Sequence, residues 1–112
     1  MDTGLITIED LSRIDLRIAE IKSVEDHPNA DKLVVLKIDA GDGIEGRQLV
    51  AGIKGHYSPS ELIGKKIIIV NNLSPAVLRG MESQGMLLAA QDGQNVVLLG
   101  PDKDISPGAP VR

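Results

Sequence analysis

Cysteine, tryptophan and phenylalanine are absent from this sequence, and Tyr57 is its only aromatic residue. Without cysteine the chain cannot form a disulfide or a thiolate metal site, and a cysteine nucleophile is excluded. Proteins that bind single-stranded nucleic acids commonly stack bases on aromatic rings. Any nucleic acid bound here therefore has to be recognised through its backbone, its shape or a few polar contacts.

Long apolar runs are missing as well. No segment approaches the ~20 consecutive apolar residues of a membrane span, and the acidic start MDTGLITIED lacks the basic and apolar regions of a signal peptide. We expect a cytoplasmic protein that is not bound to a membrane. The 112 residues have the length of one domain, 1–112, which is long enough to bury a core without disulfides.

Positive charge is scarce, with 12 basic and 16 acidic side chains and a net charge of −4. This balance alone argues against a nucleic-acid partner. The charge is unevenly distributed, because residues 1–31 carry 3 basic and 8 acidic side chains whereas residues 32–90 carry 7 and 5. We therefore expect a negatively charged partner to meet only one face, formed by the middle of the chain.

Patterns typical of catalysis are also missing. His27 and His56 have no second histidine or acid at a metal-ligand spacing such as HExxH. There is no GxSxG motif, and GDGIEG (41–46) lacks the strand-to-helix context of a phosphate-binding loop. We expect both histidines to be surface or loop residues, and we expect no metal, no cofactor and no enzymatic activity.

Local patterns predict two short helices and six strands. Residues 7–13 are predicted to form a helix with Thr7 as N-cap, and residues 58–64 a helix in which Ser58 and Glu61 form a capping box. Apolar runs bounded by turn residues predict strands at 14–24, 33–40, 47–53, 65–72, 85–91 and 95–100. In the first strand the apolar residues change parity after Ile18, which indicates a bulge or bend.

The order of these elements favours one fold. A helix between the third and fourth of five strands is the arrangement of the OB-fold, a partly open Greek-key barrel used for oligonucleotides and oligosaccharides. Short strands at this spacing also occur in sandwiches. We predict an all-β protein, a five-stranded OB-fold barrel with an N-terminal helix and a C-terminal extension that is rich in proline and glycine.

The segment NNLSPAVLRGMESQGMLLAA (71–90) places polar groups between strands. Arg79 offers a planar charged fork suited to phosphate, Ser83 a hydroxyl donor and Met86 a pliable apolar contact. Alternatively, this is a long connection whose polar groups satisfy its own backbone. The same ambiguity holds for Lys32 at the start of a strand and for Lys65 and Lys66, since lysines also protect strand edges.

The segments DLRIAEI, HPNADKL, RQLVAGI, NNLSPAVLRGMESQGMLLAA and VVLLGPD together resemble the tRNA-binding domain family, over residues 7–110 and in matching order. This family includes the C-terminal module of methionyl-tRNA synthetases, stand-alone structure-specific tRNA-binding proteins and the endothelial monocyte-activating polypeptide. The combination of HPNADKL with NLSPAVLRGMESQGM is specific, whereas each piece alone is weak.

The resemblance implies an OB-fold that binds the body of tRNA without reading an anticodon. The RNA-contacting positions of the family fall on Lys32, Asn72, Arg79, Ser83 and Met86, with Lys65 or Lys66 as a phosphate partner. Relatives commonly carry a lysine where this chain has Ser74, so weaker or more salt-sensitive binding is expected.

The resemblance also implies partners other than tRNA. Stand-alone members of this length look like homodimers, which here would be paired through the N-terminal helix (Ile6, Ile8, Leu11) and the tail with Val96–Leu99. The apolar residues in these segments fit a dimer interface and equally fit a lid on the barrel. An aminoacyl-tRNA synthetase is a further expected partner. Two alternatives stay open: a chaperone of the CsaA type that binds unfolded or exported polypeptides, and a purely structural dimerisation module that tethers a synthetase.

Overall fold

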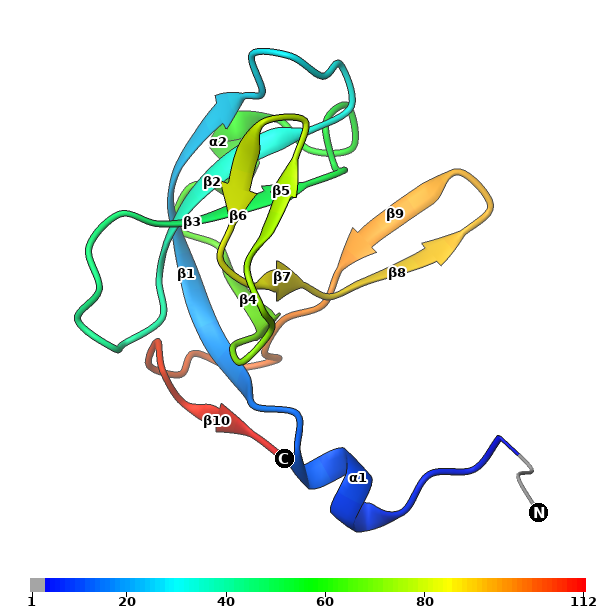
Figure 1. Cartoon of the computed structure of the whole chain (residues 1–112). Helices are drawn as coiled ribbons and strands as arrows, with labels where there is room; N and C mark the ends of the chain where they lie inside the picture. Colours follow the sequence, from blue (N-terminus) through cyan, green and yellow to red (C-terminus); the bar gives the residue numbers. More distant parts are fainter. Residues whose placement is uncertain (1–3) are drawn as a thin grey trace.

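An antiparallel sheet that curls into a nearly closed barrel is the framework of the chain (Figure 1). The computed structural model describes residues 4–112, so the first three residues of the predicted domain lie outside the description. The strand order is β3-β2-β1-β4-β7, with the short helix α2 between β3 and β4 along the chain. The predicted OB-fold is therefore confirmed. The bounds are β1 Leu16–Asp26, β2 Val34–Asp39, β3 Arg47–Ala51, α2 Pro59–Leu62, β4 Lys66–Val70 and β7 Met86–Leu87.

Strand β1 is long and bends across the barrel. Its first half, Leu16–Glu20, pairs with β4, and its second half, Glu20–Asp26, pairs with β2. The pairing with β2 shifts between Ile21 and Ser23, which confirms the predicted bulge. Bulges increase local twist, and this one lets a single strand contribute to both sides of the barrel.

The core is aliphatic and comes from the inward face of every barrel strand. Leu62 of α2 is buried as well, so the helix covers one end of the barrel. The Ser58–Glu61 capping box that starts α2 is formed as predicted. The largest fully buried apolar side chains are Ile21, Leu36, Leu49, Val50, Leu62, Ile67 and Ile69.

The chain termini form additions to the barrel. Thr7 caps α1 (Ile8–Ser12) as predicted, with Asp10 completing a capping box, yet none of the helix residues is buried. The C-terminal extension returns to the barrel, where β10 (Pro110–Val111) pairs with the start of β1. A Cβ on Gly41 would lie 2.5 Å from the carbonyl oxygen of Pro107, so only glycine allows the extension to approach so closely.

Two hairpins differ from the predicted strands. The predicted strand 85–91 divides into β7 and β8 (Ala89–Asp92), and β8 leaves the barrel to pair with β9 (Asn95–Leu98). The connection between β4 and β7 holds a second hairpin, β5 (Ala76–Leu78) with β6 (Met81–Ser83), which was not predicted. Figure 1 shows the β8–β9 hairpin projecting from the barrel and the β5–β6 hairpin lying across it.

The barrel is closed between β3 and β7 by hydrogen bonds from Ser83, at the end of β6, and from Gln84, which follows it. The Ser83 hydroxyl accepts from Val50 N–H at 3.0 Å and donates to the Gly85 carbonyl at 2.8 Å. Gln84 pairs with Gln48 twice, through its backbone N–H at 2.7 Å and its side-chain oxygen at 3.0 Å. These bonds satisfy the edge of β3 without a regular ladder to β7.

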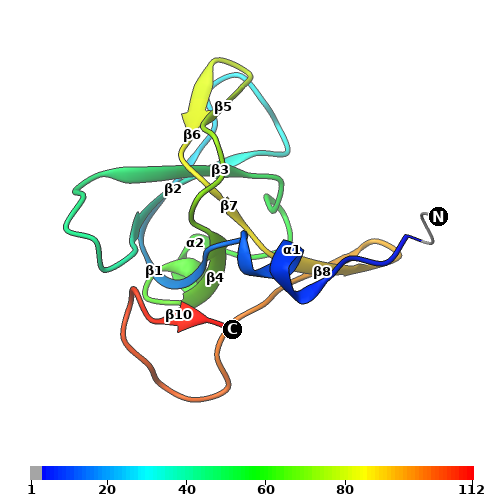
Figure 2. The ribbon, with the colours of Figure 1, turned by 60° about the horizontal axis from the view of Figure 1, so that its bottom comes forward.

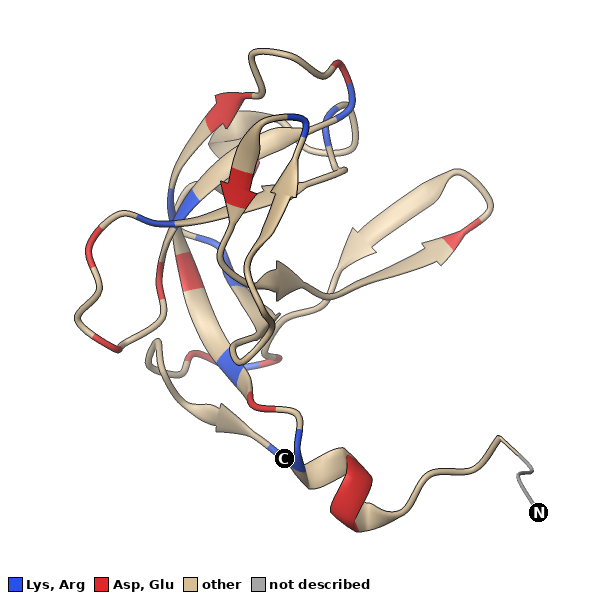
Figure 3. Cartoon of the chain, in the orientation of Figure 1, with Lys and Arg blue, Asp and Glu red and all other residues tan. Residues whose placement is uncertain are grey.

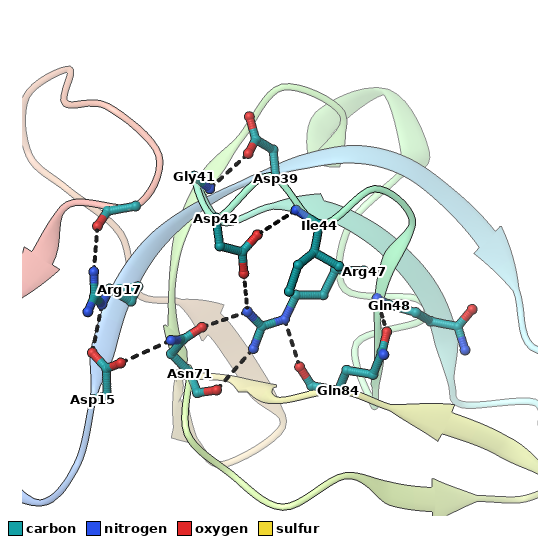
Figure 4. A network of polar contacts seen from close by, with 11 residues as sticks. Asp15, Arg17, Asp39, Gly41, Asp42, Ile44, Arg47, Gln48, Asn71 and Gln84 are labelled. Atoms are coloured by element: carbon teal, nitrogen blue, oxygen red, sulfur yellow. Dashed lines mark hydrogen bonds and ion pairs between the residues drawn. The ribbon is translucent and has the colours of Figure 1, made fainter.

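A buried arginine reinforces this closure (Figure 4). Arg47 is only 7% exposed, and its guanidinium donates to the Asp42 carboxylate at 2.8 Å and to the Asn71 side-chain oxygen at 2.6 Å. It also donates to the carbonyls of Asn71 and Gln84, both at 3.0 Å. A buried charge needs such a complete set of partners, and the set joins the β2–β3 loop to both ends of the β5–β6 hairpin.

The carboxylates of this network are held in the ionised state. Hydrogen bonds from Arg17 and Asn71 lower the pKa of Asp15 below its ordinary value. Burial raises the pKa of Asp42, but hydrogen bonds from Ile44 N–H and Arg47 outweigh that effect and lower the pKa overall. Ionised carboxylates at both positions therefore favour the folded state.

Ser83→Ala is expected to lower the free energy of unfolding by about 1–3 kcal/mol, because it leaves the buried Val50 N–H without an acceptor. Urea unfolding followed by circular dichroism measures this change. Ser74→Ala, at an exposed position of the same connection, is the control and should change stability by less than about 0.5 kcal/mol. Equal stability of the two variants would contradict the closure described above.

Acid is expected to destabilise the fold through Asp15 and Asp42. A lowered folded-state pKa contributes stability that is present above the unfolded-state pKa of about 3.9 and is lost as pH falls through the folded-state value. The free energy of unfolding should therefore decrease below about pH 4. Asp42→Asn should be less stable than wild type at pH 7 and less sensitive to acid. If the free energy of unfolding of this variant depended on pH as that of the wild type does, the stabilising role given to the Asp42 carboxylate would be refuted.

Candidate nucleic-acid interface

Two connections lie side by side at one end of the barrel (Figure 1). The first is the loop of residues 27–33 between β1 and β2, and the second is the β5–β6 hairpin between β4 and β7. In OB-folds the connection after the first strand, the connection before the fifth strand and the face of strands two and three form the ligand surface. We call this end of the barrel, formed by residues 27–33 and 76–83, the loop face.

Hydrogen bonds tie the two parts of the loop face together. His27 Nε2 lies 2.9 Å from the Leu78 carbonyl oxygen, and Asn29 N–H donates to His27 Nδ1, also at 2.9 Å. The Arg79 guanidinium donates to the Asn29 carbonyl at 3.3 Å. His27 lies in a loop, which agrees with the predicted surface or loop position, but it is buried there, with only 5% of its surface exposed. His56 is exposed, as predicted.

Arg79 owes its position to an unusual backbone conformation. It has φ +54° and is followed by Gly80 with φ +89°, and together they form the two-residue turn between β5 and β6. Positive φ at both central residues is the requirement of a type I′ turn, which suits the twist of a hairpin. Few residues other than glycine adopt such a φ. The turn holds the exposed Arg79 over the 27–33 loop.

Lys32 and Arg79 are brought together as predicted. Both line a shallow surface hollow of about 290 Å³, together with Ala30, Asp31 and Leu33. Their side chains come from segments that are 47 positions apart in the sequence. The hollow combines two cations and one carboxylate, that of Asp31, with the apolar side chains of Ala30 and Leu33. The two cations can contact a phosphate, and the apolar side chains the sugar or base attached to it.

A third cation, Lys54, lies next to this hollow and was not predicted. Its backbone N–H donates to the Lys32 carbonyl at 3.4 Å, and its ammonium group lies 3.3 Å from the Asp26 carboxylate. No local pattern marks Lys54, since its position depends on the pairing of β2 with β3. In Figure 3 several Lys and Arg segments gather around the loops at this end of the barrel.

Three further predicted positions have structural contacts of their own, and Asn72 is not brought to the loop face, because its side chain is bound at the opposite end of β1 from residues 27–33. Ser83 is 1% exposed and its hydroxyl is used in barrel closure, so it is not presented on the surface. The side chain of Asn72 donates to the Arg13 carbonyl at 2.7 Å and accepts from Asp15 N–H at 2.9 Å. Met86 is half-buried at the start of β7, where it pairs with Val70.

Lys65 and Lys66 are not brought to the loop face. Lys66 donates to the Asp104 carboxylate at 2.6 Å and to the Ile105 carbonyl, and it thereby holds the C-terminal extension. Its strand partner is Glu20, and the loop face begins seven residues further along the chain, about 23 Å at ~3.3 Å per residue. The ammonium group of Lys65 lies 5.7 Å from the centre of the Tyr57 ring.

A second hollow, of about 370 Å³, lies beside Arg47, but the guanidinium there is already bonded to Asp42, Asn71 and Gln84. Within residues 4–112 no group of three or more histidine, aspartate or glutamate side chains is placed to hold a metal ion. Within the same residues no helix is long and apolar enough to cross a bilayer. The loop face is therefore the candidate site.

Comparison with known proteins agrees with this assignment. The family model described as "Putative tRNA binding domain" matches residues 16–110. Methionine–tRNA ligase of Pyrococcus horikoshii is 57% identical over 107 residues, which cover 96% of this chain and 14% of the ligase. That of Thermotoga maritima is 56% identical over 110 residues, covering 98% and 17%. The chain thus spans only 14–17% of the length of these relatives.

Solved structures with the same fold carry two kinds of name. The CsaA chaperone protein from Picrophilus torridus has a TM-score of 0.88 and 39% identity, covering 96% of this chain and all of that one. The MetRS related protein from Pyrococcus horikoshii has a TM-score of 0.87 and 34% identity, covering all of both chains. Since the family model matches most of the sequence, and relatives are more than 50% identical to it over nearly its whole length, this chain belongs to the tRNA-binding domain family.

Proposed function

We propose that the chain binds the folded body of tRNA without catalysing a reaction, through phosphate contacts at the loop face. The observation that carries the proposal is the shared hollow of Lys32 and Arg79, on the surface that OB-folds use for oligonucleotides. The backbone of Lys54 adjoins Lys32, but its ammonium group is paired with the Asp26 carboxylate, so it is not counted among the phosphate contacts. Family membership supports tRNA as the nucleic acid.

The binding mode follows from the chemistry of the loop face. The only aromatic ring, that of Tyr57, accepts the Leu98 N–H at its hydroxyl and lies beneath Lys65, so it is part of the framework. Bases consequently have no ring to stack on, and recognition relies on charge and shape. Ser83 acts through the barrel closure. Asn72 and Met86 lie toward the Leu16 end of β1, away from the loop face, and are left out of the contact set together with Lys65 and Lys66.

We also propose that the protein works in the cytoplasm, alone or with a methionyl-tRNA synthetase. The identity of about 57% with a part of methionine–tRNA ligase supports the synthetase connection. Ser74 is exposed where relatives commonly have lysine. With a cation fewer, the loop face should bind more weakly, and a synthetase that also holds the tRNA would compensate for this.

A homodimer is the proposed assembly. The exposed apolar side chains Ile6, Ile8 and Leu11 lie on or next to α1. Of the predicted segment Val96–Leu99, Val97 and Leu99 are exposed, whereas Val96 and Leu98 pack against the barrel core. Both regions project from the barrel (Figure 2), and a two-stranded hairpin is barely stable in water alone. A second copy of the chain would cover both apolar surfaces and support the β8–β9 hairpin.

A polypeptide chaperone is the alternative function, and the likeness to the CsaA protein of Picrophilus torridus is what favours it. A competition binding experiment distinguishes tRNA binding from polypeptide binding. We expect folded tRNA to bind, unstructured RNA of equal length to bind weakly, and unfolded polypeptide to displace neither. Displacement of tRNA by polypeptide at similar concentration would favour the chaperone. If the chain bound neither tRNA nor polypeptide, a structural dimerisation module would be favoured.

Arg79→Ala should weaken the binding of all tRNAs by about tenfold or more, since a phosphate contact carries no sequence information. For wild type, log K should fall with log salt by about 0.7–0.9 per phosphate neutralised, and the variant should lose about one such unit. Filter binding or fluorescence anisotropy at several salt concentrations measures both effects.

The matched control for this experiment is Lys103→Ala, which removes an exposed cation from the C-terminal extension. It should bind tRNA nearly as wild type does. Equal effects of the two substitutions, or an affinity that stays constant from low to moderate salt, would refute the proposed site.

Ile8→Lys and Val97→Lys should convert the dimer to a monomer, because each places a charge in the proposed apolar interface. Sedimentation equilibrium gives the mass, and circular dichroism shows whether the barrel stays folded. Ile63→Lys, at an exposed apolar position after α2, is the control and should stay dimeric. A wild-type protein that is monomeric at tens of micromolar would contradict the assembly.

A further inference from the structure

His27 connects the two parts of the loop face with both nitrogens of one buried ring. Asn29 N–H can only donate, so Nδ1 has to accept, and the Leu78 carbonyl can only accept, so Nε2 has to donate. One state of the imidazole satisfies both partners, namely the neutral ring with its proton on Nε2. A charged ring would direct an N–H at the Asn29 N–H.

The two partners of this ring are adjacent to the proposed RNA contacts. Leu78 immediately precedes Arg79, and Asn29 accepts from the Arg79 guanidinium and lies three residues before Lys32. The loop is closed at its base by a hydrogen bond from His27 N–H to the Leu33 carbonyl at 3.2 Å. Without the ring, the hydrogen bond of 3.3 Å from Arg79 to Asn29 would be the main polar link between hairpin turn and loop.

We propose that His27, as the neutral Nε2–H tautomer, is the positioning residue that fixes Arg79 and Lys32 at the spacing needed to grip adjoining phosphates. This inference rests on the proposed function. The ring itself is too deeply buried to reach RNA. Its contribution is to hold the β5–β6 turn against the 27–33 loop before RNA arrives, which lowers the ordering cost of binding.

Two substitutions separate the roles of the ring nitrogens. A Gln at position 27 can place an amide donor near the position of Nε2 and keep the bond to Leu78, while an Asn can place an acceptor near Nδ1 and keep only the bond to Asn29. If the hydrogen bond from the ring to Leu78 contributes more to tRNA binding than the one to Asn29, tRNA affinity should decrease in the order wild type, His27→Gln, His27→Asn. His27→Ala should bind about tenfold more weakly than wild type, each measured below its own melting temperature.

A double-mutant cycle with Arg79→Ala distinguishes positioning from a general loss of stability. If His27 acts through Arg79, His27→Ala should have little further effect on tRNA affinity once Arg79 is removed. The inference would be overturned if the two substitutions had additive effects on the free energy of tRNA binding. It would also be overturned if His27→Ala bound tRNA with full affinity while Arg79→Ala bound it weakly. Either result would leave the proposed function standing. If Arg79→Ala and Lys32→Ala both bind as wild type, the proposed function fails, and the inference fails with it.

The tautomer is observable without RNA. Long-range ¹H–¹⁵N correlation spectra of the free wild-type protein at neutral pH should show His27 protonated on Nε2 alone. A ring protonated on Nδ1, or on both nitrogens, would overturn the inference even if the His27 variants fail to fold.

Discussion

Closure of the barrel by Ser83 and Gln84 is the constraint on which the rest of the structure depends. Regular strand pairing ends at β3 on one side and β7 on the other. Hydrogen bonds from Ser83 and Gln84 to β3 satisfy this edge, and Arg47 joins the same segment to Asn71 and Asp42. The β5–β6 hairpin is thereby fixed at both of its ends. A hairpin held in this way can carry Arg79 to the 27–33 loop.

Several cationic side chains of this molecule have structural roles. The ion pairs of Arg17, Arg47 and Lys66 stabilise the framework or the C-terminal extension, and these cations are therefore not available to a phosphate. Lys32 and Arg79 belong to none of the ion pairs found among residues 4–112. Since charges are screened over about 8 Å at physiological salt, distant carboxylates do little to cancel these cations, and Asp31 is the one carboxylate among the residues that line their hollow. A chain with a net charge of −4 can therefore present a local site for an anion.

The sequence predicted the parts of the fold that depend on local chemistry. The Ser58–Glu61 box and the Thr7 cap use hydrogen bonds within four residues, and the bulge of β1 shows as a change of apolar parity. The β5–β6 hairpin was missed because its strands are three residues long and only weakly buried. What holds this hairpin is β3 and His27, which are far from it in sequence.

The same distinction between local sequence signals and tertiary contacts applies to the residues of the candidate site. Lys32 and Arg79 were recognisable because a family resemblance marks them, and the structure places them in one hollow. The family resemblance also indicates Ser83, but its side chain is buried and has a structural role. The burial of His27 and the position of Lys54 depend on tertiary packing, so no spacing in the sequence indicates either.

The most direct test of the account is to locate the RNA on the protein. Amide chemical-shift changes in ¹⁵N-labelled protein during titration with tRNA report which residues meet the ligand. The account predicts that the changes concentrate in residues 27–33 and 76–83 and around Lys54. Changes centred on α1, the β8–β9 hairpin or the C-terminal extension, with the loop face unaffected, would contradict it.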